Sequence, residues 1–268
     1  MHRVVVIGGV HHDRIWQLDE PLTRGRRLRF SARGIRIGGG GFHTGCQLLE
    51  RGAAVTMVTS LAQDEKGLAA LAALKEAGFD TRHVTMTPGE TVPLEILLEP
   101  DGERTILAPA HRSARLFSAN GPLMGDAVYI NALRLDEALV ATLRDIPLAV
   151  SQLPLGPAVP RPVDYVVSSR ADAGADLPSA WQRAVAIAGP RLKMLVLTDG
   201  ARRIALHDGH RTVEVETAPA VTGVSTIGAG DRFSAAFLLG LLDGLDEASA
   251  ASTASRTIAD WLRRRQFP

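Results

Sequence analysis

The chain has few of the residues that mark secreted, membrane-spanning or strongly charged proteins. One of its 268 residues is cysteine, Cys46, which excludes an intramolecular disulfide and fits a reducing compartment. Lysine and arginine number 30 and aspartate and glutamate 29, so the net charge of +1 favours neither nucleic acid nor an anionic membrane as partner. No apolar run approaches the roughly 18 residues that span a bilayer. We therefore expect a soluble cytoplasmic protein, with Cys46 as a buried structural thiol.

Two common phosphate-binding motifs are also missing. The pattern Gly-x4-Gly-Lys-Ser/Thr does not occur, which excludes a P-loop enzyme. The glycine run Gly38–Gly41 does not satisfy Gly-x-Gly-x-x-Gly, and it opens the second predicted helix instead of the first βαβ unit. These absences disfavour a dinucleotide-binding role.

Short β-branched runs alternate with helical patterns along most of the chain. Strands are predicted at Val4–Ile7, Val55–Thr59, Ala127–Ile130, Leu148–Ser151, Tyr165–Ser168 and Met194–Thr198. Helices are predicted at about 42–51, 64–77, 135–144, 178–189, 230–242 and 246–264. Continuous apolar strands separated by helices indicate a mostly parallel sheet that is covered on both faces. Ligands of such sheets gather beyond the carboxyl ends of the strands.

Two segments, 13–37 and 91–108, interrupt this alternation with β-rich patterns. Within the second, a Pro100-Asp-Gly turn separates two apolar runs, which is a strong hairpin signal. Another hairpin is predicted for Arg203–His207 and Thr212–Glu216 around Asp208-Gly209. An antiparallel patch at the edge of a parallel core is the simplest interpretation of the first two segments.

The turn Thr226-Ile-Gly-Ala-Gly-Asp231 runs directly into a strongly apolar helix. Consecutive N–H groups at such a turn, together with the helix dipole, favour an anionic group. Asp231 would stand beside that group as a base that accepts a hydroxyl proton. The alternative is an ordinary glycine-rich loop with an aspartate at a helix start.

Three motifs together resemble the PfkB (ribokinase-like) carbohydrate kinases. Thr226–Asp231 is similar to the family's C-terminal signature, Gly38–Gly45 to its N-terminal double-glycine signature, and Leu197–Gly200 to its nucleotide loop. The resemblance implies an α/β fold of three α/β/α layers, with a mostly parallel central sheet and a small β-sheet lid. Residues 1–12, 38–90 and 109–268 would form the core with the ATP and catalytic sites, and 13–37 and 91–108 the lid over the substrate.

The resemblance implies ATP-dependent phosphorylation of a hydroxymethyl group of a sugar or sugar-like substrate. Asp231 would be the general base, with the amides of Gly228, Ala229 and Gly230 as an anion hole. The implied acceptor-binding residues are Asp13, Gly38, Gly39, His43 and Asn131, and the implied ATP-binding residues are Thr198, Gly200 and Ser169.

The chain departs from the family pattern at the positions that handle cations and at one acceptor position. The family's Asn-x-x-Glu motif falls on Ser169–Asp172, so Mg²⁺ would be carried mainly by ATP, with Asp172 contributing through water. Ser225 replaces the acidic residue that the family uses near a monovalent cation site, which puts that cation in doubt. His43 stands where an asparagine is usual, and this puts the substrate preference in doubt. His11 and His12 point to opposite faces of a strand and are not expected to share a metal ion.

Two alternatives remain beside a sugar kinase. One is a nucleoside kinase of the same family, although an aromatic content of 4% gives little material for stacking a base. The other is a non-catalytic regulator that binds a sugar or nucleotide on the same scaffold. Lid strands of this family often pair edge to edge, so a homodimer through the lid is expected. The arginine clusters Arg24–Arg29 and Arg263–Arg265 are interpreted as solvated strand and helix ends.

Overall fold

The computed structural model describes residues 1–110, 115–174 and 176–265; the predicted core range 109–268 therefore includes positions outside the described residues. Its main sheet has the strand order β15-β14-β13-β12-β11-β9-β1-β4-β5. The parallel strands are β1 (Arg3–Gly8), β4 (Ala54–Ala62), β5 (Asp80–Thr87), β9 (Ala127–Asn131), β11 (Leu148–Gln152), β12 (Tyr165–Ser169) and β13 (Met194–Thr198). The antiparallel strands β14 (Ile204–His207) and β15 (Thr212–Val215) extend one edge, which confirms the predicted second hairpin.

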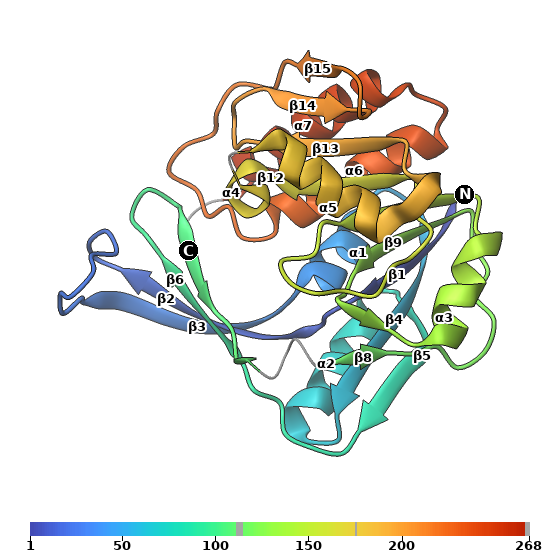
Figure 1. Cartoon of the computed structure of the whole chain (residues 1–268). Helices are drawn as coiled ribbons and strands as arrows, with labels where there is room; N and C mark the ends of the chain where they lie inside the picture. The colour runs from blue at the N-terminus through green and yellow to red at the C-terminus, as the bar shows by residue number, and fades with distance from the viewer. Residues whose placement is uncertain (111–114, 175, 266–268) are drawn as a thin grey trace.

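Helices cover both faces of this sheet, as the sequence pattern predicts (Figure 1). One face packs against α1 (Gly40–Glu50), α2 (Glu65–Glu76), α6 (Ala229–Leu242) and α7 (Glu247–Arg263). The other face packs against α3 (Glu137–Thr142) and α5 (Leu177–Ala188). Side chains of each strand alternate between the two apolar clusters; Val4 and Val6 of β1 enter one, and Val5 and Ile7 enter the other. The predicted three-layer α/β/α arrangement is confirmed.

Every predicted strand of the core is present, but β5 was not predicted. Its sequence, Asp-Thr-Arg-His-Val-Thr-Met-Thr, is largely polar because the strand lies at the edge of the sheet and pairs on one side only, with β4. Short elements complete the core: α4 (Arg170–Ala173) and a two-stranded sheet of β8 (Leu116–Phe117) and β10 (Arg134–Leu135).

Cys46 on α1 is half-buried, and burial raises the pKa of its thiol to about 11, so it stays protonated.

A separate small sheet projects from the core, with the order β3-β2-β6-β7 (Figure 1). Its strands are β2 (His11–Leu18), β3 (Phe30–Gly38), β6 (Leu94–Leu98) and β7 (Arg104–Leu107). β6 and β7 form the hairpin predicted around Pro100-Asp-Gly. β2 pairs in parallel with β6, so the sheet is mixed and not wholly antiparallel. This small sheet joins two segments that are far apart in the chain.

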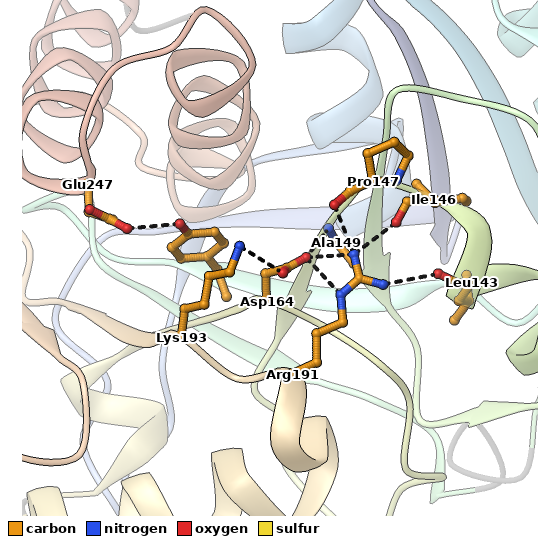
Figure 2. Close-up of polar contacts among 9 residues, drawn as sticks. Leu143, Ile146, Pro147, Ala149, Asp164, Arg191, Lys193 and Glu247 are labelled. Carbon is orange, nitrogen blue, oxygen red and sulfur yellow. Dashed lines mark hydrogen bonds and ion pairs between the residues drawn. The ribbon is translucent and has the colours of Figure 1, made fainter.

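A buried carboxylate ties the strands together at their amino ends. Asp164, directly before β12, accepts hydrogen bonds from Ala149 N (2.9 Å) and from Arg191 Nε (3.0 Å) and Nη2 (2.8 Å). Lys193 Nζ lies 3.2 Å from its other oxygen (Figure 2). The Arg191 guanidinium also donates to the carbonyl oxygens of residues 143, 146 and 147. This network links β11, β12 and β13 at their amino ends, and the predicted site lies at the carboxyl ends of the strands.

Candidate active site

The turn before α6 has the backbone conformation that its glycines suggest. Gly228 caps the helix with φ +82°, and a Cβ atom there would lie 2.8 Å from Cγ of the His43 ring. Only glycine meets both conditions without strain. The Ala229 N–H donates to Thr226 O at 3.0 Å and so closes the turn. Among the described residues, no acceptor meets the N–H groups of Gly228 and Gly230, which leaves these two predicted anion-hole amides available.

Asp231 lies on the first turn of α6 and is partly buried. Its Oδ1 accepts a hydrogen bond from Asn131 Nδ2 at 3.3 Å, and its backbone oxygen accepts one from Thr44 Oγ1 at 3.2 Å. Burial raises the pKa of Asp231 to about 6, against the opposing effects of Arg104 and of the Asn131 amide. A carboxyl group whose pKa lies close to neutrality is well matched to general-base chemistry.

Asn131 stands at the carboxyl end of β9, and the glycine loop before α1 reaches the same point. A Cβ atom at Gly40 would lie 1.9 Å from Asn131 Nδ2 and 2.9 Å from Asp231 Oδ1. Gly41 N donates to Gly9 O at 3.1 Å, so the loop after β1 belongs to the same cluster. The tertiary fold therefore brings together glycine segments that the sequence placed at separate strand ends.

Asp13 and His11 of β2 form a buried polar pair beside this loop. His11 Nε2 lies 3.2 Å from Asp13 Oδ1, and both side chains are about nine-tenths buried or more. A Cβ atom at Gly38 would lie 1.9 Å from Asp13 Oδ2, and one at Gly39 (φ +104°) would lie 2.6 Å from the His11 ring. The two glycines thus make room for the pair. His12, one residue on, bonds instead to Lys66 O at 2.8 Å.

His43 projects from α1 toward the turn before α6. Its Nε2 is buried and meets no hydrogen-bond partner among the described residues. Burial lowers the pKa of His43 to about 4, although nearby Asp13 acts to raise it. The imidazole is therefore neutral at physiological pH and keeps one unused polar atom, which a ligand hydroxyl can satisfy.

The predicted nucleotide residues lie apart from this cluster, and the hydroxyl groups of Ser169 and Thr198 form hydrogen bonds with nearby residues. Ser169 caps α4, where its Oγ accepts from Asp172 N (3.1 Å) and donates to Asp172 Oδ2 (2.8 Å). Thr198 Oγ1 donates to Ser168 O at 3.3 Å, and Gly200 turns with φ +58°. An open cleft next to this loop is lined by Arg170, Asp199, Ala201, Arg202, Arg203 and Glu214, among others. In the part of the chain that the structure describes, no hydrogen bond joins these residues to Asp231.

The structure adds Arg104, which the sequence patterns did not single out. Arg104 Nη1 donates to Thr226 Oγ1 at 3.5 Å, and Thr226 Oγ1 in turn donates to Gly102 O at 3.2 Å. The same guanidinium lowers the pKa of Asp231. The β6–β7 hairpin thus contacts the turn before α6. An arginine next to a hairpin turn is normally interpreted as a solvated residue. No signal in the sequence therefore pointed to this contact.

Comparison with known proteins confirms the family resemblance and the fold. Residues 163–259 match the model of the pfkB family carbohydrate kinases. Ribokinase from Bacillus subtilis (strain 168) is 26% identical over 272 residues, which cover 96% of this chain and 91% of that protein. A ribokinase from Cryptococcus neoformans var. grubii in complex with ADP superposes with a TM-score of 0.73 at 17% identity, over 99% of this chain and 95% of the other. A nucleoside kinase from Burkholderia thailandensis in complex with inosine also gives 0.73, at 14% identity over 98% and 92%.

A search of the described residues for membrane-crossing segments finds no helix with both the length and the apolar character required.

Proposed function

We propose that this ribokinase-family protein is an ATP-dependent kinase that phosphorylates a hydroxymethyl group of a sugar or sugar-like polyol. The observation that carries this proposal is Asp231, a partly buried carboxylate with a pKa of about 6 beside the free amides of Gly228 and Gly230. A protein that only binds a sugar has no use for a base held in this way.

The reaction follows from the placement of these groups. Asp231 accepts the proton of the acceptor hydroxyl, and the acceptor oxygen forms a bond to the γ-phosphorus of ATP. The bond from that phosphorus to the β–γ bridging oxygen breaks, and ADP leaves with its electron pair. The Gly228 and Gly230 amides face the oxygens of the phosphoryl group in transfer and need no reorientation as their charge shifts.

The acceptor would bind between the lid and the glycine loop. Asp13 offers carboxylate oxygens to sugar hydroxyls, and the unpartnered Nε2 of neutral His43 offers one further hydrogen bond. Asn131 is already bonded to Asp231, so its role would be to orient the base as well as to line the pocket.

ATP would bind along Thr198, Gly200 and Ser169 at the carboxyl ends of β12 and β13. Mg²⁺, when bound with ATP, neutralises phosphate charge. In the described chain no group of three or more His, Cys, Asp or Glu side chains could hold a metal ion, and Asp172 already bonds to Ser169. This fits an ion that ATP and water carry, with Asp172 in a water-mediated contact.

Release of ADP from ATP, measured with a panel of pentoses, hexoses and nucleosides, tests this proposal. We expect turnover with a sugar in the wild type and a loss of about 10²-fold or more in kcat for Asp231→Asn, with acceptor binding kept. Asp260→Asn, an exposed aspartate of α7, is the matched control. Equal kcat in wild type and Asp231→Asn would refute the base assignment.

The same panel separates the two alternatives. Turnover with nucleosides alone would identify a nucleoside kinase, an activity that the similarity to the Burkholderia thailandensis protein keeps open. Tight sugar binding without turnover would identify a regulator, an alternative that the self-bonded Ser169 and Asp172 support.

The predicted homodimer through the lid is supported by exposed apolar side chains on its strands, Phe30, Ile35, Ile106 and Leu107. Sedimentation equilibrium of the wild type and of an Ile35→Lys variant would test it, because a charge at a lid interface would favour the monomer.

A further inference from the structure

Arg265, just past the end of α7, reaches the back of the catalytic turn. Its Nη1 donates to Ile227 O at 2.8 Å, and Ile227 directly precedes Gly228. The guanidinium carbon lies 4.4 Å from the ring centroid of Trp261, which holds the side chain by cation–π contact. This half-buried arginine therefore departs from the interpretation of Arg263–Arg265 as a solvated helix end.

Within residues 1–110, 115–174 and 176–265, no carboxylate neutralises the charge of Arg265. Arg232, which contacts the same tryptophan ring, binds both carboxylate oxygens of Glu50 at 2.7 and 2.8 Å. For Arg265, by contrast, no carboxylate lies within ion-pair distance among the described residues. Burial lowers the pKa of Arg265, as do Arg36 and Arg232, yet a guanidinium stays protonated at neutral pH. The positive charge also reaches the acceptor side, because it acts to lower the pKa of His43.

The monovalent cation that the family resemblance implied does not fit this environment. Ser225 contributes a hydroxyl where a carboxylate is expected, and that hydroxyl accepts from Ile227 N at 3.5 Å. The adjacent carbonyl, Ile227 O, is taken by Arg265. A metal cation here would meet a fixed guanidinium without a carboxylate to offset the repulsion.

We propose that Arg265 is a positioning residue that takes the place of a monovalent cation. By holding Ile227 O, it orients the Gly228 amide toward the phosphoryl group, and its uncompensated charge favours an anion at the turn. This inference rests on the proposed kinase function, and it predicts an enzyme that does not depend on K⁺.

The test compares wild type, Arg265→Ala, Arg265→Lys and the control Arg264→Ala, whose side chain is exposed on the neighbouring position. Replacement of K⁺ by tetramethylammonium at equal ionic strength should leave wild-type kcat within about twofold. Arg265→Ala should lose about tenfold or more in kcat with little change in the acceptor KM. K⁺ or guanidinium should restore part of that loss, and Arg265→Lys should keep more activity than Arg265→Ala.

A second readout does not require turnover. The melting temperature of Arg265→Ala should rise in KCl relative to tetramethylammonium chloride, and that of the wild type should not. Inorganic phosphate should bind more weakly to Arg265→Ala than to Arg264→Ala. If the wild type phosphorylates no acceptor, the kinase proposal fails while these measurements still decide the role of Arg265. A K⁺-dependent wild type, or an Arg265→Ala variant that matches Arg264→Ala throughout, would overturn the inference.

Discussion

Asp164 is buried and Asp231 partly buried, at opposite ends of the strands of the main sheet, and their surroundings differ. Asp164 accepts from a backbone amide and twice from Arg191, with Lys193 at 3.2 Å (Figure 2). From the described residues, the Asp231 carboxylate accepts a single side-chain hydrogen bond, 3.3 Å long, from a neutral amide. Asp164 is fully satisfied as a charged group, and Asp231 is not.

The difference separates a carboxylate whose charged form the fold stabilises from one whose charged form receives little stabilisation, as the proposed general base requires. Donors that fill every lone pair stabilise the charged form and leave nothing for a ligand. A carboxylate with few donors stays basic and can take a proton from a substrate. The same contrast holds between the proposed acceptor side, where His43 Nε2 meets no partner among the described residues, and the proposed nucleotide side, where Ser169 and Asp172 bond to each other.

The largest expected effect on stability is that of Asp164→Asn. The substitution leaves the Arg191 guanidinium partly buried without its carboxylate, so we expect a loss of about 3 kcal/mol in the free energy of unfolding. Urea denaturation measures it, with Asp260→Asn as a surface control that should change by less than about 1 kcal/mol. A loss in Asp164→Asn no greater than in this control would break the distinction between the two aspartates.

Substitution of Asp231 should change the free energy of unfolding in the opposite direction, toward greater stability. Because its folded pKa is raised to about 6, the folded state binds the proton more tightly than the unfolded state. The resulting penalty is absent at low pH, grows as pH rises toward 6 and then stays constant. Asp231→Asn should therefore gain about 3 kcal/mol of stability at pH 7 and almost nothing at pH 3.5. Chemical denaturation at both pH values measures this; a destabilised variant at pH 7 would contradict it.

The pH dependence of turnover gives a second view of the same group. Only deprotonated Asp231 accepts a proton, so wild-type kcat/KM, which reports the pKa of the free enzyme, should reach a plateau above pH 6 and fall about tenfold per pH unit below it. Titration of His43 should not change the activity near neutral pH, because the pKa of His43 is lowered to about 4. A pH-independent kcat/KM between pH 4.5 and pH 7 would count against Asp231 as the base.

Arg104→Ala should have a moderate effect, about tenfold in kcat/KM, because Arg104 contacts the turn at its edge. Arg104 also lowers the pKa of Asp231, so the acid limb of the pH profile should move to higher pH in the variant. Arg27→Ala, an exposed residue between β2 and β3, serves as the control. If the limb stays in place, the lid arginine does not act on the base.

Ser169→Ala should have the smallest effect. The hydroxyl is spent on capping a one-turn helix, so we expect a change within about threefold in kcat and a stability loss of about 1 kcal/mol or less. Steady-state kinetics with varied ATP and Mg²⁺ measures the effect. A loss in kcat above about tenfold would contradict this expectation and assign Ser169 a direct role in binding the nucleotide.

The strands and helices of the core followed from local patterns, because the apolar runs of β1, β9 and β12 must be buried on both faces of a parallel sheet. The edge strand β5 was not predicted, because a strand that pairs on one side only can carry polar residues such as Asp80 and Arg82. The order of the glycine motifs also indicated a resemblance to the family; residues 163–259 match the pfkB model, and ribokinase from Bacillus subtilis is similar over most of the chain.

Residue types and their order along the chain were thus readable without coordinates, since periodicity, turns and helix starts depend on neighbours within a few positions. Which polar groups face one another was decided by the folded chain. The bond from Asn131 to Asp231 spans 100 positions, that from Arg104 to Thr226 spans 122, and that from Arg265 to Ile227 spans 38. Such contacts form only where packed strands and helices bring distant segments together, and they determine which of the aspartates is left able to take a proton.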